Sequence, residues 1–351
     1  MTVARADDPA IEALRGLAAL AVVAAHYARF VALEPGVWGF ASTGVDLFFV
    51  LSGYVFGAYF FGKALAPGPH LVRRFFRLYP LYVLALITYA ALKMPDPHAW
   101  REFGSHLFML HTLQSPQVAF FYNPAFWSLP PEVEFYLLLP LLAVLGRRGQ
   151  FGRLFAAALA LHLLLAAFAV AGEGSTPRAV ATVHLPGLLV EFCLGAWAYH
   201  AVRAQPSPRA AAWRLAAGAA WLVVVGWLYA VFIADGRGAS APAWIGGNIG
   251  LGAAAGYALV VSALATRAQR LRGLALRACL VAGELSYAVY LFHNAAAQAV
   301  ERATGASGWA ALGMSLAFTL LVAFVLHHAV EAPAREFGRQ WSRRLGQRQR
   351  A

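Results

Sequence analysis

The sequence predicts an all-α integral membrane protein that crosses the bilayer about ten times. Of its 351 residues, 60% are hydrophobic and only 13% are charged, whereas soluble domains carry about 25% charged residues. The hydrophobic residues gather in runs of about 20, the length that a membrane-spanning helix needs. The two cysteines lie in or beside such runs without CxxC spacing, so we expect neither a disulfide framework nor a metal site.

Ten apolar segments account for this prediction. The loops between them are short and rich in Pro, Gly or Arg. The longest, about 95–125, is too polar to cross a membrane but is suited to a short interfacial helix. The expected helices cover about 11–33, 38–61, 76–94, 126–145, 151–171, 182–202, 213–234, 243–266, 279–300 and 308–330. We expect them to form one membrane-embedded domain over 1–351, with no appended soluble domain.

The basic residues predict the orientation of these helices. The net charge is +12, but most Arg residues lie in short loops between apolar runs, so a nucleic-acid partner is not expected. If the N-terminus is cytoplasmic, 22 of the 28 Lys and Arg residues fall in cytoplasmic segments. Because positive charge accumulates on the cytoplasmic side of membrane proteins, we expect both termini to lie there.

The first span, 11–33, carries charge that a simple membrane anchor would not. Arg15, His26 and Arg29 lie within the run IEALRGLAALAVVAAHYARFVAL. Arg15 and His26 are 11 residues apart in the sequence, which places them on one helix face about 16 Å apart along the axis. An ionisable residue inside a membrane is costly and usually functional. We therefore expect this span to form one wall of a buried site.

A layer of titratable side chains is expected at a similar depth in five of the spans. Measured from the cytoplasmic end of each helix, at about 1.5 Å per residue, these side chains lie about 16 to 22 Å deep. They are His26, Asp46, Glu132, Glu191 and His293. Such groups should face each other rather than lipid. The alternative for Glu191 is that it only anchors an arginine.

Six stretches of sequence go beyond composition. In chain order they are RGLAALAVVAAH (15–26), GVDLFFVLSGYVFG (44–57), RRFFRLYP (73–80), WSLPPEVEFYLLLP (127–140), SYAVYLFH (286–293) and VEAPAR (330–335). Together they resemble the acyltransferase-3 family of bacterial membrane proteins, over essentially the whole chain. The resemblance implies an enzyme that moves an acyl group, usually acetyl from acetyl-CoA. The acceptors of the family are sugars of surface polysaccharides, peptidoglycan or small secreted molecules.

The resemblance assigns the chemistry to His26. The Arg-x10-His pattern matches Arg15 and His26. The histidine is expected to take a proton from the acceptor hydroxyl or to carry the acyl group covalently. Glu132, in the WSLxxE pattern, is expected to orient the imidazole or share its proton, and Asp46 is a second candidate for that role. Two prolines precede Glu132, so we expect a helix to begin there with Glu132 in its first turn.

The same resemblance assigns donor binding to arginines. The RxxR-Leu-x-Pro pattern matches Arg74 and Arg77, with Arg73 beside them. Because positions i and i+3 share a helix face and guanidinium groups grip phosphates bidentately, these residues and Arg15 are expected to hold acyl-CoA. The alternative is a cluster of positive charge that only sets topology. Candidates for binding the acceptor or for a structural polar layer are Trp127, Ser128, Ser52, Tyr136, Glu191 and His293.

The sequence therefore predicts a membrane-bound O-acyltransferase of the bacterial cytoplasmic membrane. The expected donor is acetyl-CoA or another short acyl-CoA, and the expected acceptor is a hydroxyl of a sugar, glycan or small molecule. No oligomeric state is predicted. The alternative is a transporter or acyl-group conduit, in which the polar layer conducts a substrate or protons. A purely structural scaffold would leave the buried charges unexplained.

Overall fold

Ten membrane-spanning segments make up most of the chain. The computed structural model describes residues 8–31, 35–94, 96, 98–114, 116–171, 183–234, 241–267 and 272–348, and these residues form helices and no strands. Ten of the described segments are long and apolar enough to cross a membrane, which confirms the predicted fold class and number of spans. They are Pro9–Val31, Trp38–Phe60, Pro67–Lys93, Pro124–Arg147, Phe151–Phe168, Leu185–Arg203, Pro208–Ile233, Trp244–Ala265, Gly273–Thr304 and Gly308–Gln347.

Several spans consist of more than one helical element. The first four contain α1 (Pro9–Tyr27) with η1 (Ala28–Val31), α2 (Pro35–Phe40) with η2 (Ala41–Thr43) and α3 (Gly44–Phe60), α4 (Pro67–Lys93), and η4 (Pro124–Ser128) with α8 (Leu129–Arg147). The expected interfacial segment before η4 holds α5 (His98–Arg101), α6 (Phe103–Leu107), η3 (His111–Leu113) and α7 (Pro116–Ala119). The later spans contain α9 (Phe151–Ala171), α11 (Leu185–Arg203), α12 (Pro208–Tyr229) with η5 (Ala230–Ala234), α13 (Ala241–Arg267), α14 (Gly273–Thr304), and α15 (Gly308–Leu326) with η7 (His327–Glu331) and α16 (Ala332–Arg348).

The expected starts of the third and ninth helices lie well inside the observed helices, and both err in the same direction. The third helix begins at Pro67 rather than near 76, and the ninth begins at Gly273 rather than near 279. Each added stretch carries arginine. Arginine lowers the hydropathy that marks a membrane span but is a good helix former, so the helix continues past the apolar run. The last residues of the expected first helix, 32–33, lie outside the described residues.

The second span contains a tightened turn rather than one continuous helix. In η2 the hydroxyl of Ser42 donates to the Gly39 carbonyl at 2.7 Å, and that of Thr43 donates to the Phe40 carbonyl at 2.8 Å. Such side-chain bonds offer the backbone an alternative to α-helical pairing. The turn sets where α3 begins and therefore where Asp46, in its first turn, is placed.

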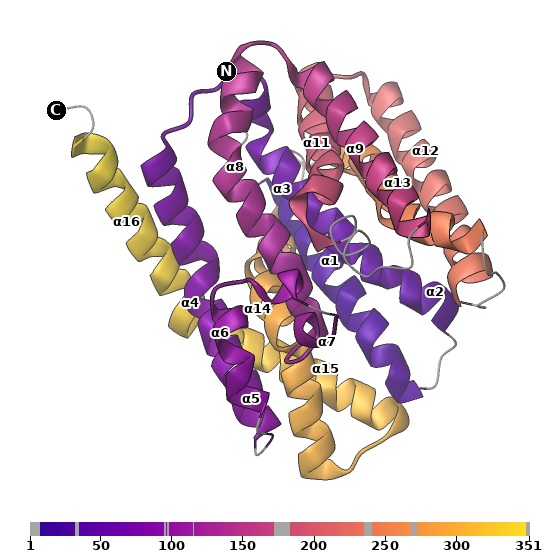
Figure 1. Cartoon of the computed structure of the whole chain (residues 1–351), viewed down its shortest axis with the longest axis vertical. Coiled ribbons are helices and arrows are strands. Elements are labelled where there is room, and N and C mark those ends of the chain that lie inside the picture. The colour runs from indigo at the N-terminus through magenta and orange to yellow at the C-terminus, as the bar shows by residue number, and fades with distance from the viewer. Residues whose placement is uncertain are drawn as a thin grey trace.

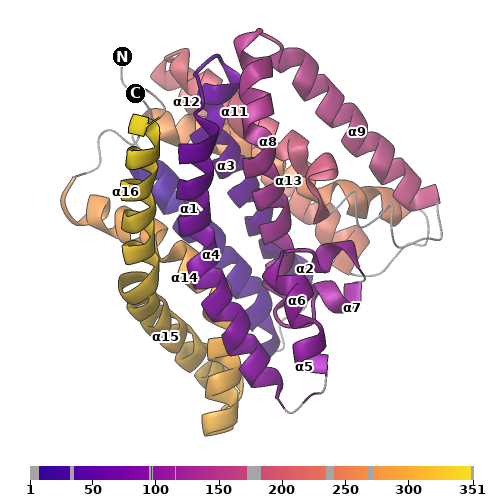
Figure 2. The ribbon, with the colours of Figure 1, turned by 60° about the vertical axis from the view of Figure 1, so that its left-hand side comes forward.

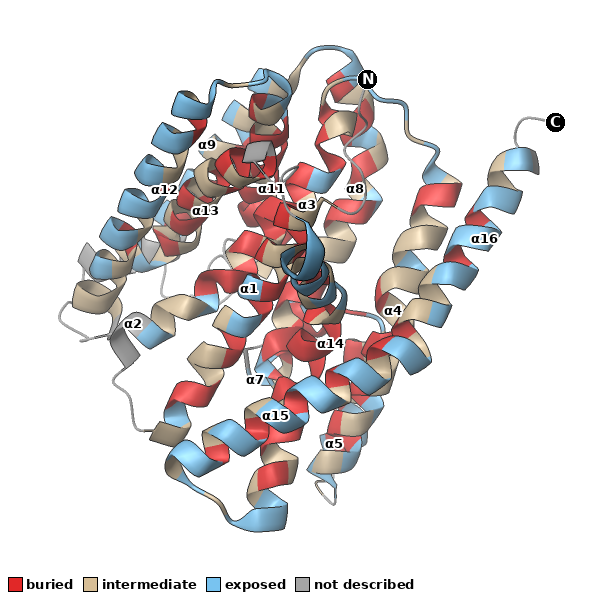
Figure 3. Ribbon diagram, turned by 180° about the vertical axis from the view of Figure 1, so that it is seen from behind, coloured by how far each residue is buried: buried red, intermediate tan, exposed pale blue. Residues whose placement is uncertain are grey.

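Four helices form the centre of the bundle. α3 packs along α11, and α1 packs along α14. Red, buried segments concentrate on these helices in Figure 3. α3 and α11 approach closely at Gly195, where a Cβ atom would collide with the backbone carbonyl of Val50. This close approach brings the polar side chains of α3 and α11 within reach of each other.

The outer helices expose apolar side chains, as expected for a surface that faces lipid. The exposed face of α12 carries Trp213, Trp221, Val223 and Trp227, and α12 is largely pale blue in Figure 3. Apolar faces this extensive are not stable in water, and tryptophan is enriched at membrane interfaces. The exposed surface thus agrees with the membrane assignment.

Both ends of the described chain lie at the same end of the bundle (Figures 1 and 2). We call this the terminal end. The basic tail expected after residue 330 is the helix α16, which packs along α4 and returns to the terminal end (Figure 2). The short helices α5, α6 and α7 gather at the opposite end, which we call the cap end (Figures 1 and 2).

Candidate active site

Two neighbouring cavities lie inside the bundle. The larger, of about 380 Å³, is lined by His26 and Asp46 among others, and we call it the histidine cavity. The smaller, of about 80 Å³, is lined by three arginines and Glu132, and we call it the arginine cavity. Val45 and Tyr290 line both cavities, so the two spaces meet at these side chains.

His26 lies in the last turn of α1, where it lines the histidine cavity and contacts α14. Its Nδ1 atom is 3.0 Å from Nε2 of His293, and the two ring centroids are 4.9 Å apart. His293 is fully buried, and its Nδ1 atom donates to the Tyr290 carbonyl at 2.8 Å. His26 itself is half-buried. The structure thus joins two of the predicted polar residues into one pair.

This pair fixes the tautomer of both imidazoles when they are neutral. Because Nδ1 of His293 carries the proton that the Tyr290 carbonyl accepts, Nε2 of His293 has a lone pair. Nδ1 of His26 must then be the donor across the 3.0 Å contact. A neutral imidazole carries one proton, so Nε2 of His26 keeps its lone pair. That nitrogen is free to accept a proton from a molecule in the histidine cavity.

The two carboxylates predicted to act on His26 contact other groups. Glu132 lines the arginine cavity, where Ser52 donates to it at 3.3 Å and the Tyr136 hydroxyl also donates to it. Asp46 lines the histidine cavity but hydrogen-bonds the carboxyl group of Glu191. Among the described residues, neither carboxylate is a hydrogen-bond partner of the His26 ring, which contacts His293 and the backbone carbonyl of Val22.

The start of α8 follows the sequence. α8 begins at Leu129, with two prolines in its first turn and Glu132 beside them, as predicted. Proline has no backbone N–H to lose at these positions and its fixed φ suits a helix start. The preceding Ser128 forms a 2.6 Å hydrogen bond with the hydroxyl of Tyr290, and that hydroxyl also donates to the Ala125 carbonyl. Ser128 and Tyr290 therefore form part of the wall between the cavities.

Two of the three arginines in the arginine cavity are held in close ion pairs. Arg15 lies 2.6 Å from Glu12, one turn earlier on α1. Arg77 lies 2.6 Å from Glu331 of η7, whose side chain is fully buried. A buried carboxylate next to a guanidinium neutralises its charge and holds the side chain in one position. These two arginines are therefore fixed parts of the cavity wall.

Arg74 is the third arginine of this cavity, and it is held differently. Its guanidinium lies over the rings of Phe56 and Tyr136, at 5.2 and 5.6 Å from their centroids. Its Nε atom is buried and has no hydrogen-bond partner among the described residues. Arg73, the fourth predicted donor-binding residue, donates to Ser342 of α16 at 3.2 Å instead and is not among the residues that line the cavity.

Three residues in or next to these cavities were not selected from the sequence. Glu12 and Glu331 neutralise the arginines, and His162 lines the histidine cavity. Glu331 lies within the VEAPAR stretch, one of the six stretches noted in the sequence. The sequence did not indicate that Glu331 pairs with Arg77. His162 is a lone histidine in the apolar helix α9, and an ionisable residue inside a span was the signal that could have found it.

Glu134, on the other face of α8 from Glu132, has a structural role. Its carboxylate bonds Nδ1 of His184 at 2.8 Å and accepts from the backbone N–H of Leu185 at 2.8 Å. The second bond satisfies a free N–H at the start of α11. The first bond raises the pKa of His184 above its ordinary value, because the carboxylate favours the protonated ring.

Comparisons with known proteins point to one family. The model of the acyltransferase domain, Acyl_transf_3, matches residues 8–328. Protein 2 of the picA locus of Rhizobium radiobacter is 45% identical over 86 residues, which are 23% of this chain and 43% of that protein. Acyltransferase MdmB of Streptomyces mycarofaciens is 29% identical over 163 residues, which are 42% of each chain. The chain thus spans less than half the length of these curated relatives, and no solved structure matches it.

The family match covers every residue that lines the two cavities. It leaves out Glu331 and α16, which follow the matched range. The matched range therefore includes most of the described chain, with both cavities and most of the ten candidate membrane-spanning segments. The chain belongs to the acyltransferase-3 family.

Proposed function

We propose that this protein transfers a short acyl group, acetyl by default, from acyl-CoA in the arginine cavity to a hydroxyl of an acceptor in the histidine cavity. One observation carries the proposal. The two cavities meet at Val45 and Tyr290, with guanidinium groups on one side and the free Nε2 of His26 on the other. A thioester that reaches this junction lies between its binding groups and a base.

The donor is held by its phosphates at Arg74. This guanidinium has no ion pair with a described residue and keeps an unpartnered Nε, so it can donate to an anion without losing a protein contact. Arg15 and Arg77 add positive charge around it. From the level of Arg15, the thioester must extend along the bundle by about 16 Å to reach His26.

The reaction is a nucleophilic acyl transfer. Nε2 of His26 takes the proton of the acceptor hydroxyl while the hydroxyl oxygen attacks the thioester carbonyl carbon. A carbon–oxygen bond forms, the carbon–sulfur bond breaks, and the proton passes from His26 to the sulfur of CoA. The products are an ester and free CoA. If the acyl group is carried covalently by the histidine, the same unprotonated nitrogen performs the attack.

Glu132 acts on the donor side in this scheme. Arg74 hydrogen-bonds the Tyr136 hydroxyl, which in turn donates to Glu132. This chain of contacts connects the free arginine to the first turn of α8. Glu132 is a positioning residue for the donor cavity, in place of the role at His26 that the sequence suggested.

The same scheme gives the orientation in the membrane. We place the terminal end of the bundle in the cytoplasm of a bacterial cell, because most of the arginines belong to segments at that end. The arginine cavity then faces the side on which acyl-CoA is made. The histidine cavity lies toward the cap end, so the acceptor enters from within the membrane or from outside.

Reconstituted protein tests transfer against transport. Proteoliposomes are supplied with acyl-CoA labelled in the acyl group, and both free CoA and the position of the label are followed. Transfer predicts that free CoA appears in step with a labelled covalent product. Label that crosses the membrane without release of CoA would contradict the proposal and support a conduit.

A further inference from the structure

A pair of carboxyl groups in the histidine cavity has no role in the reaction described above. Asp46 of α3 and Glu191 of α11 hydrogen-bond each other, and both line the cavity. A Cβ atom at Gly250 of α13 would collide with Asp46, so three helices enclose the pair closely. Two carboxyl groups in hydrogen-bond contact must share at least one proton. The pair therefore carries at most one negative charge in this state.

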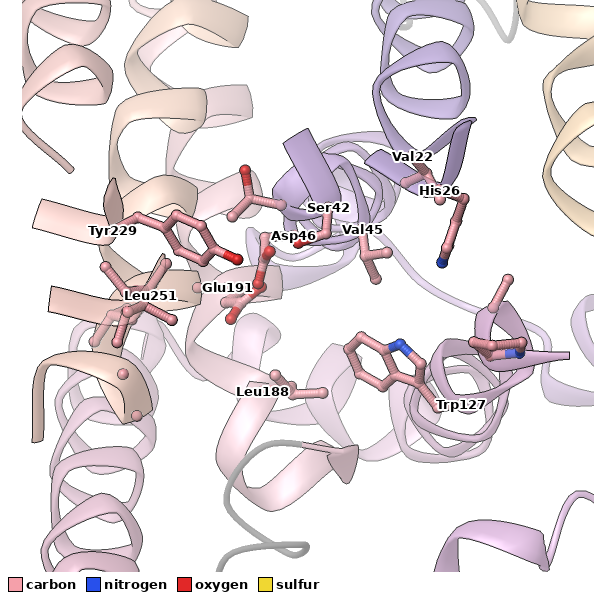
Figure 4. A pocket seen from close by; sticks show the side chains of 18 of the residues that line it. Val22, His26, Ser42, Val45, Asp46, Trp127, Leu188, Glu191, Tyr229 and Leu251 are labelled. Carbon is pink, nitrogen blue, oxygen red and sulfur yellow. The ribbon is translucent and has the colours of Figure 1, made fainter. Parts of the chain in front are cut away.

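One oxygen of this pair is free. Glu191 is only 1% exposed, yet its Oε2 atom has no hydrogen-bond partner among the described residues. A buried polar atom without a partner costs free energy, and a native protein usually supplies the partner from a ligand or water. Figure 4 shows Glu191 and Asp46 together beside Tyr229, across the cavity from His26 and Trp127.

A second unpartnered acceptor belongs to another residue that lines the same cavity. His162 is 3% exposed and its Nδ1 donates to the Gly187 carbonyl of α11 at 2.7 Å. Its Nε2 therefore holds a lone pair, and it too has no partner among the described residues. Gly187 and Glu191 are four residues apart on α11, so the His162 ring is anchored about one helical turn from Glu191 along that helix, and both side chains line the histidine cavity.

No basic side chain balances the carboxyl groups of the histidine cavity among the described residues that line it. None of the described residues that line the histidine cavity is Lys or Arg, although Glu191 is buried there and Asp46 is half-buried. A buried carboxylate without a cation is costly. The remaining walls are largely apolar or aromatic, with Trp127 and Tyr229 among them. Aromatic faces also attract organic cations.

We propose that the acceptor carries a basic amine, which binds as an ammonium group at Asp46, Glu191 and His162 while the acceptor's hydroxyl lies at His26. The inference rests on the proposed function, because it takes the histidine cavity as the acceptor site. An ammonium group supplies both things that the cavity lacks, a positive charge and hydrogen-bond donors. A neutral polyol supplies the donors alone. The amine and the reacting hydroxyl therefore lie at opposite ends of the acceptor, as the two sides of the cavity do (Figure 4).

A binding experiment tests this without requiring turnover. Cyclohexylamine, protonated at neutral pH, and cyclohexanol have nearly the same shape, and their dissociation constants are measured for the full chain in lipid nanodiscs. Glu191→Gln keeps the shape of the side chain and removes its charge. It should weaken cyclohexylammonium binding at least about tenfold and change cyclohexanol binding by less than about twofold, because a charge-assisted hydrogen bond is lost.

Two further variants make the comparison decisive. Glu284→Gln removes an exposed carboxylate of α14 outside both cavities and should leave both probes unaffected. His162→Asn keeps a donor for the Gly187 carbonyl but is too short to place an acceptor where Nε2 of His162 lies, and it should weaken only cyclohexylammonium. It tests the site even if Glu191→Gln does not fold. The proposal is overturned if the variants weaken both probes equally, or if the wild type binds the ammonium no better than Glu191→Gln and His162→Asn do.

A matched pair of acceptors separates failure of this inference from failure of the proposed function. 4-(Dimethylamino)cyclohexanol and 4-isopropylcyclohexanol differ in the charged nitrogen, and a tertiary amine cannot form a stable amide. CoA release should be at least about tenfold more efficient with the amine in the wild type and nearly equal for the two in Glu191→Gln. Equal use of both by the wild type overturns the inference and leaves the transferase standing. Turnover that persists in His26→Ala overturns the proposed function.

Discussion

Nδ1 of His26 lies 3.0 Å from Nε2 of His293, which joins two residues that are 267 positions apart into one hydrogen-bonded pair. The far nitrogen of His293 is anchored on the Tyr290 carbonyl, so the buried ring cannot rotate freely. His293 therefore holds the His26 imidazole in the tautomer that leaves Nε2 unprotonated. The partner of the proposed base is thus a second histidine, where the sequence suggested a carboxylate.

Replacement of His293 tests this arrangement. His293→Ala should lower kcat about 100-fold or more, because His26 loses the acceptor that fixes its tautomer, while KM for both substrates should change little. His293→Gln keeps an acceptor and should recover part of the loss. Thr319 is a buried residue nearby, and its hydroxyl hydrogen-bonds that of Tyr27. Thr319→Val removes this bond and should leave kcat nearly unchanged. Equal losses in Ala and Gln variants would assign His293 a purely structural role.

Donor binding should depend on Arg74 much more than on Arg73. Arg74→Gln removes the guanidinium that has no ion pair in the arginine cavity. Its loss should raise KM for acyl-CoA by about 10- to 100-fold, the effect of losing charge-assisted hydrogen bonds worth about 1.5–3 kcal/mol. Arg73→Gln removes an adjacent charge that contacts α16 and should raise KM less than about threefold. Similar effects of both variants would mean that the cluster only sets topology.

The ion pair between Arg77 and Glu331 should be a large contributor to stability. Glu331→Gln leaves a buried guanidinium without its carboxylate and should lower the free energy of unfolding by about 3–5 kcal/mol. Glu336 forms a pair of similar length with Arg339, but both side chains are about half exposed. Glu336→Gln should therefore lower the free energy of unfolding much less than Glu331→Gln does. Denaturation of both variants in the same detergent gives the comparison, and equal losses would contradict it.

The cap end should lose stability as the pH falls. His106 and His111 stack with ring centroids 4.2 Å apart, and each has a buried nitrogen without a partner among the described residues. Burial lowers the pKa of His111 to about 3, and the neighbouring His106 ring adds to the effect. Burial also lowers the pKa of His106. Both rings are therefore neutral in the folded protein at neutral pH.

The sign follows from proton binding. Between pH about 6.5 and about 3 the unfolded chain protonates His111 whereas the folded chain does not. Stability is therefore lost as the pH falls through this window, by up to about 1.4 kcal/mol per unit for this group. His111→Gln keeps a donor for the Phe126 carbonyl and cannot titrate, so its unfolding temperature should fall less steeply with acid than that of the wild type. The exposed His98→Gln should retain the wild-type slope; a wild-type slope in His111→Gln would contradict the account.

Most of the fold was predictable because hydropathy alone determines which segments cross a membrane. All ten spans were found, and the start of α8 was found from the two prolines before Glu132. The errors lie where a helix extends beyond the apolar part that crosses the membrane. The first turns of α4 carry His70, Arg73 and Arg74, which a hydropathy pattern excludes but which a helix accepts.

The sequence was sufficient to select most residues of the candidate site. It was not sufficient to predict which of these residues contact each other. The depth of each residue along its helix follows from the sequence, so His26, Asp46 and His293 were placed at one level. Which of these side chains are in contact depends on how α1, α3, α11 and α14 are each rotated about their axes in the bundle. A single sequence does not specify these rotations. Glu132, and Asp46 as a second candidate, were therefore expected to be partners of His26. In the structure Glu132 lines the arginine cavity and Asp46 contacts Glu191.

The most direct test of the central claim is acyl-CoA turnover by purified protein in nanodiscs, with wild type and His26→Ala compared at saturating donor. The account predicts free CoA release by the wild type and a loss of at least about 100-fold in His26→Ala, with donor binding and the unfolding temperature unchanged. The exposed His328→Ala should behave like the wild type. Undiminished CoA release by folded His26→Ala, or binding of acyl-CoA without any release by the wild type, would contradict it.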